Sequence, residues 1–322
     1  MGALTVLVTS PLLAKEGLAL LESAGLDVHF MQAFPKPEDV AAKAKAIGAA
    51  GIIARQGAIT ALVMEASPYL RIIARHGAGT DEIDLDAARA RRLLVTRTPG
   101  ANARAVAEHT IAVILALLKQ LPSIQTQLAA GKWRAGDMWV GDAYGARLGL
   151  VGMGAIGQHT ARLASAFGMK IAATSRQTAP EVYEHARREE SLERLLATSD
   201  IISLHTALTP ETRGMIDAAA LARMPKGALI INTARGGLID ETALLAAIES
   251  GHIAGAALDV TEPEPPRPDH PFRTHPRVLL TPHIGGVSAG SMTQMAVDAA
   301  ECIVAALTGG PLPADRIVVP GG

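Results

Sequence analysis

The stretch RLGLVGMGAIGQHTARLASAF, residues 147–167, decides the fold. Its first five residues predict a buried strand, and residues 158–167 carry a helical pattern. The turn between them has the form G-x-G-x-x-G and consists of Gly152, Met153, Gly154, Ala155, Ile156 and Gly157. Gly152 allows a tight turn, Gly154 lets a ligand approach the backbone, and Gly157 lets helix and strand pack closely. A strand, such a turn and a helix in this order predict a dinucleotide site, with the pyrophosphate at the helix N-terminus.

Short apolar runs alternate with helical stretches on both sides of this motif. Aromatic residues make up only 3% of the chain, so the core is expected to be aliphatic. Alternation of this kind is typical of a parallel sheet covered by helices on both faces. The predicted class is therefore α/β, with strands at 4–9, 27–30, 51–55, 70–75 and 93–96, and a second series at 147–151, 170–174, 200–204, 228–232, 254–258 and 278–280.

Several element boundaries can also be predicted. Ser10 and Pro11 predict the cap and first turn of a helix that stops at Gly25. Residues 101–121 give the longest helical pattern, apolar over most of its circumference and hence buried. Residues 261–271 (TEPEPPRPDHP) hold too many prolines for a helix or a central strand, and they predict a loop. A last helix, about 291–307, is expected to close the chain.

Composition excludes several classes of function. At roughly 150 residues per domain, 322 residues predict about two domains. A net charge of −1 provides no field for nucleic acid or an anionic membrane, and no run reaches the roughly 18 apolar residues of a membrane span. The first ten residues lack the basic region of a signal peptide. With Cys302 as the single cysteine, we expect a cytoplasmic globular protein without disulfides or a cysteine-based metal site.

The strand predicted at 170–174 bears on the choice of dinucleotide. In NAD-binding sheets the second strand ends in an acid that binds the ribose diol. Here the strand is followed by Ser175 and Arg176, and no acid is present. An uncharged residue followed by arginine is suited to the 2′-phosphate of NADP. The sequence therefore favours NADP(H) over NAD(H), the alternative being that Arg176 only faces solvent.

Three polar segments follow the ends of later predicted strands: NTARG at 232–236, DVTEPEP at 259–265 and TPHIGG at 281–286. In an open α/β sheet these ends line the ligand crevice. Together they supply one arginine, a choice of carboxylates and one histidine. A metal site is not expected, because Asp269, His270, His275 and His283 lack helical ligand spacing and cysteine partners.

These segments resemble the D-2-hydroxyacid dehydrogenase family of NAD(P)-dependent enzymes. The likeness covers nearly the whole chain and includes HGAGTD at 76–81, TPG at 98–100, VAEH at 106–109, the glycine motif and LTPET at 208–212. It implies a Rossmann-type domain at 99–286, inserted into a smaller flavodoxin-like substrate domain formed by 1–98 and 287–322. It also implies a homodimer formed through the cofactor domain.

The resemblance implies a catalytic set of Arg235, Glu264 and His283. Glu264 is preferred to Glu262 because the family's acid lies five residues after the aspartate held here by Asp259. Besides the glycine motif, Ser175 and Arg176, the cofactor contacts implied are His205, Thr206, Thr212, Thr233, Ala234, Arg235, Asp259, His283 and Gly285. The substrate contacts implied are Arg55, Arg75, His76, Gly77, Ala78, Gly79, Arg235 and His283.

The expected chemistry follows from the substrate class. Hydride addition to the ketone of a 2-oxo acid places negative charge on oxygen, and the His283 imidazolium can donate a proton there. A carboxylate on the other ring nitrogen favours the charged ring, which is the role given to Glu264. Arg235 offers a planar fork of donors to the substrate carboxylate. The backbone N–H groups of 77–79 offer a second anion contact.

The substrate itself stays open at this level. Arg55 and Arg75 end two strands of the first domain and would suit a second anionic group, as in phosphoglycerate dehydrogenases. Glyoxylate or hydroxypyruvate reduction fits equally well. The alternative outside enzymology is a dinucleotide-sensing scaffold like the C-terminal-binding corepressors, which share the fold and a similar Arg–Glu–His set.

Overall fold

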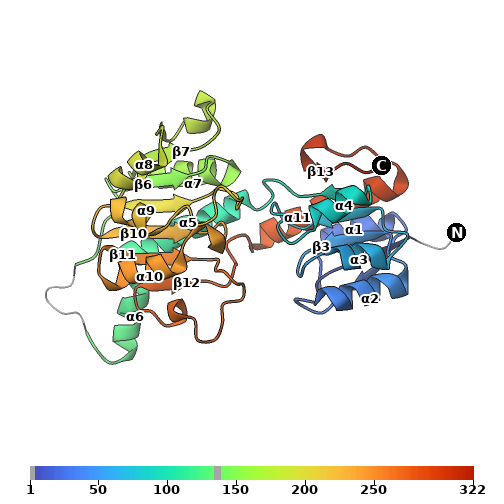
Figure 1. Ribbon diagram of the computed structural model, residues 1–322, viewed down its shortest axis with the longest axis horizontal. Helices are drawn as coiled ribbons and strands as arrows, with labels where there is room; N and C mark the ends of the chain where they lie inside the picture. Colours follow the sequence, from blue (N-terminus) through green and yellow to red (C-terminus); the bar gives the residue numbers. More distant parts are fainter. Residues whose placement is uncertain (1–3, 134–138) are drawn as a thin grey trace. The chain divides into compact units, whose positions relative to one another are not determined.

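The computed structural model describes residues 4–133 and 139–322. The chain forms two compact units, Met1–Asn102 with Val287–Gly322, and Ala103–Gly286 (Figure 1). The chain therefore leaves the first unit after residue 102 and returns to it at residue 287.

The first unit is built on a six-stranded sheet in the order β13-β5-β4-β3-β1-β2. The parallel part, 2-1-3-4-5 with β5 next to β4, is the flavodoxin-like strand order. Helices α1 and α11 cover one face, where Leu21 and Ile303 are buried, and α2, α3 and α4 cover the other. The elements are β1 Thr5–Val8, α1 Lys15–Ser23, β2 Asp27–Phe30, α2 Pro37–Ile47, β3 Gly51–Ala54, α3 Ala61–Ala66, β4 Ile72–Arg75, α4 Leu85–Ala90, β5 Leu94–Thr96, α11 Ala289–Thr308 and β13 Ile317–Val319.

The second unit holds a seven-stranded sheet in the order β12-β11-β10-β9-β6-β7-β8, and every pair is parallel. Counted within the unit this is 3-2-1-4-5-6 with a seventh strand, the Rossmann order. Helices α5 and α7 pack on one face, and α8, α9 and α10 on the other. The elements are α5 Ala103–Leu118, α6 Leu121–Ala129, β6 Arg147–Val151, α7 Ala155–Ala166, β7 Lys170–Thr174, β8 Arg187–Arg188, α8 Leu192–Thr198, β9 Ile201–Leu204, α9 Ala218–Arg223, β10 Ala228–Asn232, α10 Glu241–Glu249, β11 Ile253–Leu258 and β12 Val278–Leu280.

This architecture confirms the predicted α/β class with its two sheets. The strand order reverses between β6 and β9, and this switch point is where such sheets bind ligands, outside the carboxyl ends of the strands. The glycine turn follows β6 at that edge, and the segments at 232–236, 259–265 and 281–286 follow β10, β11 and β12 at the same edge. The fold therefore brings the polar segments singled out in the sequence to one edge of one sheet.

Several element predictions were wrong. Ser10 and Pro11 do not start a helix, because α1 begins at Lys15 and the Ser10 hydroxyl donates to the carbonyl of Leu12 at 2.6 Å. The longest described helix is α11 with 20 residues. The helix predicted at 101–121 is α5, which has 16 residues and is separated from α6 by two residues. The short strands β8 and β13 were missed, and β13 pairs antiparallel with β5. Strands of two or three residues are too short for their pattern to be recognised.

None of the described helices is by itself long and apolar enough to cross a membrane. The bent pair α5 and α6, which meet at 57°, satisfies the length and composition only when taken together.

Candidate active site

The glycine turn after β6 has the backbone that a phosphate cradle needs. Gly152 has a φ of 107°, and a Cβ there would lie 2.4 Å from the carbonyl oxygen of His205. A Cβ on Gly157 would lie 2.2 Å from the carbonyl oxygen of Gly152. Both positions therefore require glycine for reasons internal to the fold.

Gly154 differs from these two glycines. Its φ is −70°, and a Cβ built on it meets nothing within 4 Å among the described residues. No side chain caps the N-terminus of α7, so the first-turn N–H groups remain as donors. Protein packing does not explain a glycine here, but a phosphate group lying against the backbone does. The turn thus fits the pyrophosphate of a dinucleotide.

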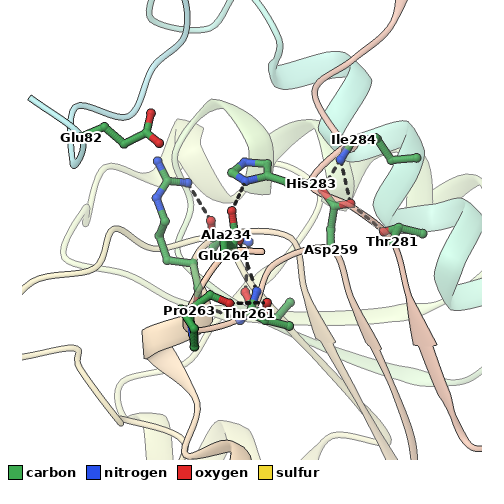
Figure 2. Close-up of polar contacts among 12 residues, drawn as sticks. Glu82, Ala234, Asp259, Thr261, Pro263, Glu264, Thr281, His283 and Ile284 are labelled. Atoms are coloured by element: carbon green, nitrogen blue, oxygen red, sulfur yellow. Dashed lines mark hydrogen bonds and ion pairs between the residues drawn. The ribbon is translucent and has the colours of Figure 1, made fainter. Parts of the chain in front are cut away.

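His283 and Glu264 form a direct pair. The Nδ1–H of His283 donates to Glu264 Oε2 at 2.7 Å, and Figure 2 shows the carboxylate of Glu264 directed at the imidazole ring. The two side chains are 52% and 37% exposed. The hydrogen bond that His283 donates to Glu264 raises the pKa of His283 above its ordinary value, against the opposing effects of burial and of the Arg235 charge. The ring is therefore charged over a wider pH range, and its Nε2 is the nitrogen left to give up a proton.

Asp259 fixes the backbone that carries His283. Its buried carboxylate accepts hydrogen bonds from the hydroxyl of Thr281 (2.6 Å) and from the N–H groups of Ile284 (2.9 Å) and Gly285 (2.8 Å). Its backbone carbonyl accepts from the N–H of His283 at 2.8 Å. Figure 2 shows this carboxylate between Ile284 and Thr281. The hydrogen bonds of the Asp259 carboxylate are all with the histidine loop, and the cofactor contact expected of Asp259 stays a prediction.

His109 on α5 lies beside this carboxylate. Its Nε2 is 3.2 Å from the hydroxyl of Thr281 and 3.7 Å from Asp259 Oδ1. A Cβ on Gly285 would lie 2.9 Å from Asp259 Oδ2 and 3.3 Å from the His109 ring, so a larger residue would not fit there. The sequence analysis did not include His109 or Thr281 in the site. The VAEH and TPH motifs that contain them were the available signal.

Arg235 is positioned by the residues that precede it. The side chain of Asn232 at the end of β10 donates to the Arg235 carbonyl at 2.8 Å and accepts from the Ala234 N–H at 3.0 Å. Arg235 NH1 donates to the Ala234 carbonyl at 2.7 Å. Its positive charge lowers the pKa of His283 and so opposes the effect of Glu264.

The other predicted cofactor contacts lie at the same edge of the sheet. Ser175 and Arg176 follow β7, while His205 and Thr206 follow β9. Burial lowers the pKa of His205 to about 4, so the ring is neutral, and its Nε2 is 3.0 Å from the hydroxyl of Ser203. Thr212 donates to the Ala207 carbonyl at 2.8 Å and so folds the 207–212 turn, and Thr233 is held 3.1 Å from the hydroxyl of Thr110.

The predicted substrate contacts of the first unit lie at the ends of β3 and β4. Arg75 donates to the carbonyls of Gly79, Ala54 and Arg55 and pairs with Glu82 at 2.9 Å, and these contacts brace the loop. Arg55 NH1 donates to the Ser10 hydroxyl and the Leu12 carbonyl. Its Nε and NH2 have no partner among the described residues.

The loop at 76–79 has both used and unused donors. The Gly77 N–H donates to the Thr98 hydroxyl at 3.0 Å, whereas the N–H groups of Ala78 and Gly79 have no partner in the described part of the chain. Burial, reinforced by the Arg55 charge, lowers the pKa of His76 to about 4. His76 is therefore neutral, and its buried Nε2 is unpartnered within the described ranges.

The predicted absence of a metal site is not contradicted. Within residues 4–133 and 139–322 no group of three His, Cys, Asp or Glu side chains is arranged to hold a metal ion.

Comparison with known proteins places this geometry in a family. Residues 111–285 match the family model described as D-isomer specific 2-hydroxyacid dehydrogenase, NAD binding domain. The chain belongs to this family. The matched segment covers the glycine turn, Arg235, Glu264 and His283. The D-2-hydroxyacid dehydrogenase family binds a nicotinamide dinucleotide and acts on small 2-hydroxy or 2-oxo acids.

Individual relatives within the D-2-hydroxyacid dehydrogenase family are similar over most of this chain. A D-3-phosphoglycerate dehydrogenase of Mycobacterium bovis is 40% identical over 265 residues, which are 82% of this chain and 50% of the relative. The chain thus spans about half the length of the curated relatives it matches. The TT0316 protein of Thermus thermophilus is 38% identical with a TM-score of 0.90, covering 98% of this chain and 100% of that one. A glyoxylate reductase of Paecilomyes thermophila is 32% identical with a TM-score of 0.87, covering 99% of each chain.

Proposed function

We propose that this protein is a dehydrogenase that interconverts a small 2-oxo acid and the D-2-hydroxy acid with a nicotinamide dinucleotide. The single observation that carries the proposal is the His283–Glu264 pair, 2.7 Å apart, at the sheet edge that also bears Arg235 and the glycine turn. When bound, the reduced dinucleotide supplies the hydride for the C2 carbon.

The roles of the three side chains follow from their chemistry. His283, kept protonated by Glu264, donates the proton that neutralises the developing alkoxide, and takes it back in the reverse direction. Glu264 fixes the ring tautomer and stabilises the charged form. Arg235 binds the carboxylate of the substrate through its planar fork of donors. Asp259 holds the backbone of His283 in place.

The unit 103–286 is proposed to bind the dinucleotide, and the unit of 1–102 with 287–322 to bind substrate anions. In the latter, the free N–H groups of Ala78 and Gly79 and the guanidinium of Arg55 are suited to anionic oxygens. A substrate with a second anionic group, such as the phosphate ester of a 2-oxo acid, makes fuller use of these donors than glyoxylate does. Arg75 is proposed to support this loop, since it donates to the Gly79 carbonyl and pairs with Glu82.

NADP(H) is the proposed dinucleotide. The residues that follow β7 are Ser175 and Arg176, without a carboxylate to bind a ribose diol. Glu189, a buried acid directly after β8, is paired with Arg187 at 2.6 Å and Arg194 at 3.2 Å. Arg176 also acts electrostatically on the exposed Glu211.

The choice of dinucleotide is tested by Arg176→Ala. We expect the variant to lose about tenfold or more in kcat/KM with NADPH, because one charge-assisted contact contributes roughly 1.5–3 kcal/mol. The value with NADH should change little. A wild-type protein that strongly prefers NADH would refute the NADP(H) assignment without affecting the assignment of His283.

The substrate is tested by measuring oxidation of NADH and NADPH with a panel of 2-oxo acids: glyoxylate, hydroxypyruvate, pyruvate, phosphohydroxypyruvate and 3-sulfopyruvate. We expect turnover with at least one of them, and higher kcat/KM for the doubly anionic members. Binding of a dinucleotide without turnover of any 2-oxo acid would refute the proposed activity and favour a sensing scaffold.

A further inference from the structure

The loop that carries Glu264 is fastened at two points by one carboxylate, that of Glu241. Glu241 is the first residue of α10, directly after the N-cap Asp240. Its Oε1 accepts a hydrogen bond from the N–H of Glu262 at 3.1 Å, and its Oε2 accepts from Nε2 of His270 at 2.9 Å. These two points lie on either side of Glu264. The side chains of Glu241 and His270 are only 19% and 9% exposed, so water competes little for these bonds.

The contact at His270 is anchored in the core. His270 Nδ1 accepts a hydrogen bond from the N–H of Phe272 at 3.4 Å, and the two rings lie 5.1 Å apart. Phe272 is fully buried in the core between the sheet of the second unit and helices α8, α9 and α10. Because Nδ1 accepts a hydrogen bond, the ring proton sits on Nε2 and is donated to Glu241.

The contact at Glu262 is linked directly to Glu264. The Glu262 carboxylate accepts two contacts from Arg213 NH1, at 2.9 and 2.8 Å. Thr261 donates its N–H to Glu264 Oε1 at 3.2 Å and its hydroxyl to the Pro263 carbonyl at 3.0 Å. A displacement of Glu262 would therefore move the backbone on which Glu264 stands.

We infer that Glu241 is a positioning residue for the acid pair, holding the 262–270 segment so that Glu264 stays within hydrogen-bond distance of His283. Among the described residues the Glu241 carboxylate has hydrogen bonds with Glu262 and His270 alone, so it acts through this segment. The expected effect of Glu241 on catalysis rests on the proposed function, whereas its expected effect on the pKa of His283 does not.

The test is the pH titration of the His283 ring in the full chain, followed by NMR and assigned with His283→Ala. In Glu241→Ala we expect the pKa of His283 to fall from its raised value toward that of an unpaired imidazole. The kcat/KM for the 2-oxo acid should fall on the order of tenfold, because small displacements of catalytic groups are costly. The KM for the dinucleotide should stay unchanged.

Two further variants keep the test decisive. Glu241→Gln retains an oxygen for the Glu262 N–H, but its amide N–H₂ faces the His270 donor, so a smaller fall in the His283 pKa is expected. Glu193→Ala is the matched control, because Glu193 is an exposed first-turn acid on α8 of the same unit and should leave the His283 titration unchanged.

An unaltered His283 titration in the folded Glu241→Ala protein would overturn the inference. If Glu241→Ala does not fold, an unaltered titration in Glu241→Gln overturns it instead. Because the titration needs no turnover, a wild-type protein inactive on all 2-oxo acids would refute the proposed function separately from Glu241.

Discussion

His283 adopts a backbone conformation that few residues other than glycine take, with a φ of 53°. The hydrogen bonds from this loop to Asp259 oppose the cost of that conformation, which is on the order of 1–3 kcal/mol. The strained conformation presents the ring to Glu264. The backbone around His283 is thus part of the site, as well as the side chain.

The His283–Glu264 pair predicts a pH dependence with a definite sign. Because Glu264 raises the pKa of His283, the proton-donating form persists to higher pH, and 2-oxo acid reduction should decline only as pH rises through that raised pKa. In Glu264→Gln the declining limb of kcat/KM should move to lower pH, with a loss of about tenfold or more near neutral pH.

The same pair also stabilises the folded protein, and this contribution likewise decreases as pH rises. It is fully present below the unfolded-state pKa of about 6.5 and is lost as pH rises through the raised folded-state pKa.

Wild-type and Glu264→Gln profiles of kcat/KM that decline at the same pH would show that Glu264 does not control the proton on His283.

At the scale of elements, the strand–turn–helix of residues 147–166 separates two roles of glycine. Gly157→Ala places a methyl group 2.2 Å from the Gly152 carbonyl oxygen, so we expect a marked fall in the melting temperature. Gly154→Ala meets no described atom within 4 Å and keeps an allowed backbone, so we expect only the cost of a poorer N-cap residue on α7, about 1 kcal/mol or less.

Gly154→Ala should nevertheless bind the dinucleotide at least about tenfold more weakly, because the methyl group occupies the space proposed for the pyrophosphate. Calorimetric melting and titration with the dinucleotide measure the two effects independently. Wild-type affinity in Gly154→Ala would contradict the assignment of this turn as the phosphate cradle.

At the scale of the whole molecule, α6 suggests how two copies associate. The helix, labelled in Figure 1, has no buried residue, and Leu121 and Leu128 on it are exposed. The neighbouring Trp133, Trp139 and Tyr144 are exposed as well. Large apolar side chains exposed in such number are typical of interaction surfaces. We propose a homodimer that covers this segment.

Sedimentation equilibrium tests the proposed dimer. The wild type should sediment as a dimer, and the double variant Leu121→Ser, Leu128→Ser should dissociate at least about tenfold more readily, since each exposed leucine would contribute roughly 1.5 kcal/mol or more when buried. The control is Leu62→Ser, an equally exposed leucine on α3 of the other unit, which should leave the dimer intact. A monomeric wild type would rule the proposal out.

The sequence predicted what local pattern encodes. The glycine turn, the α/β alternation and the polar segments after β10, β11 and β12 were all visible from neighbouring residues. The start of α1 was wrong because Arg55, 45 residues from Ser10, donates to the Ser10 hydroxyl in the structure. Likewise, β13 forms only by pairing with β5, more than 200 residues earlier.

Within the site, motif order pointed to Arg235, Glu264 and His283, but their supports were not predictable. Asp259 binds Thr281, Ile284 and Gly285 across 22 to 26 residues, and Glu241 binds His270 across 29. Such contacts depend on the tertiary fold and leave no periodic pattern. The positive φ of His283 also has no signature in its own residue type.

The most direct test of the central claim follows deuterium from C4 of the reduced nicotinamide. Wild-type protein mixed with the deuterated dinucleotide and its preferred 2-oxo acid should place the label on C2 of a D-2-hydroxy acid. His283→Ala should transfer the label at least about 100-fold more slowly while binding the dinucleotide with nearly unchanged affinity. Label transfer by His283→Ala at the wild-type rate would contradict the account.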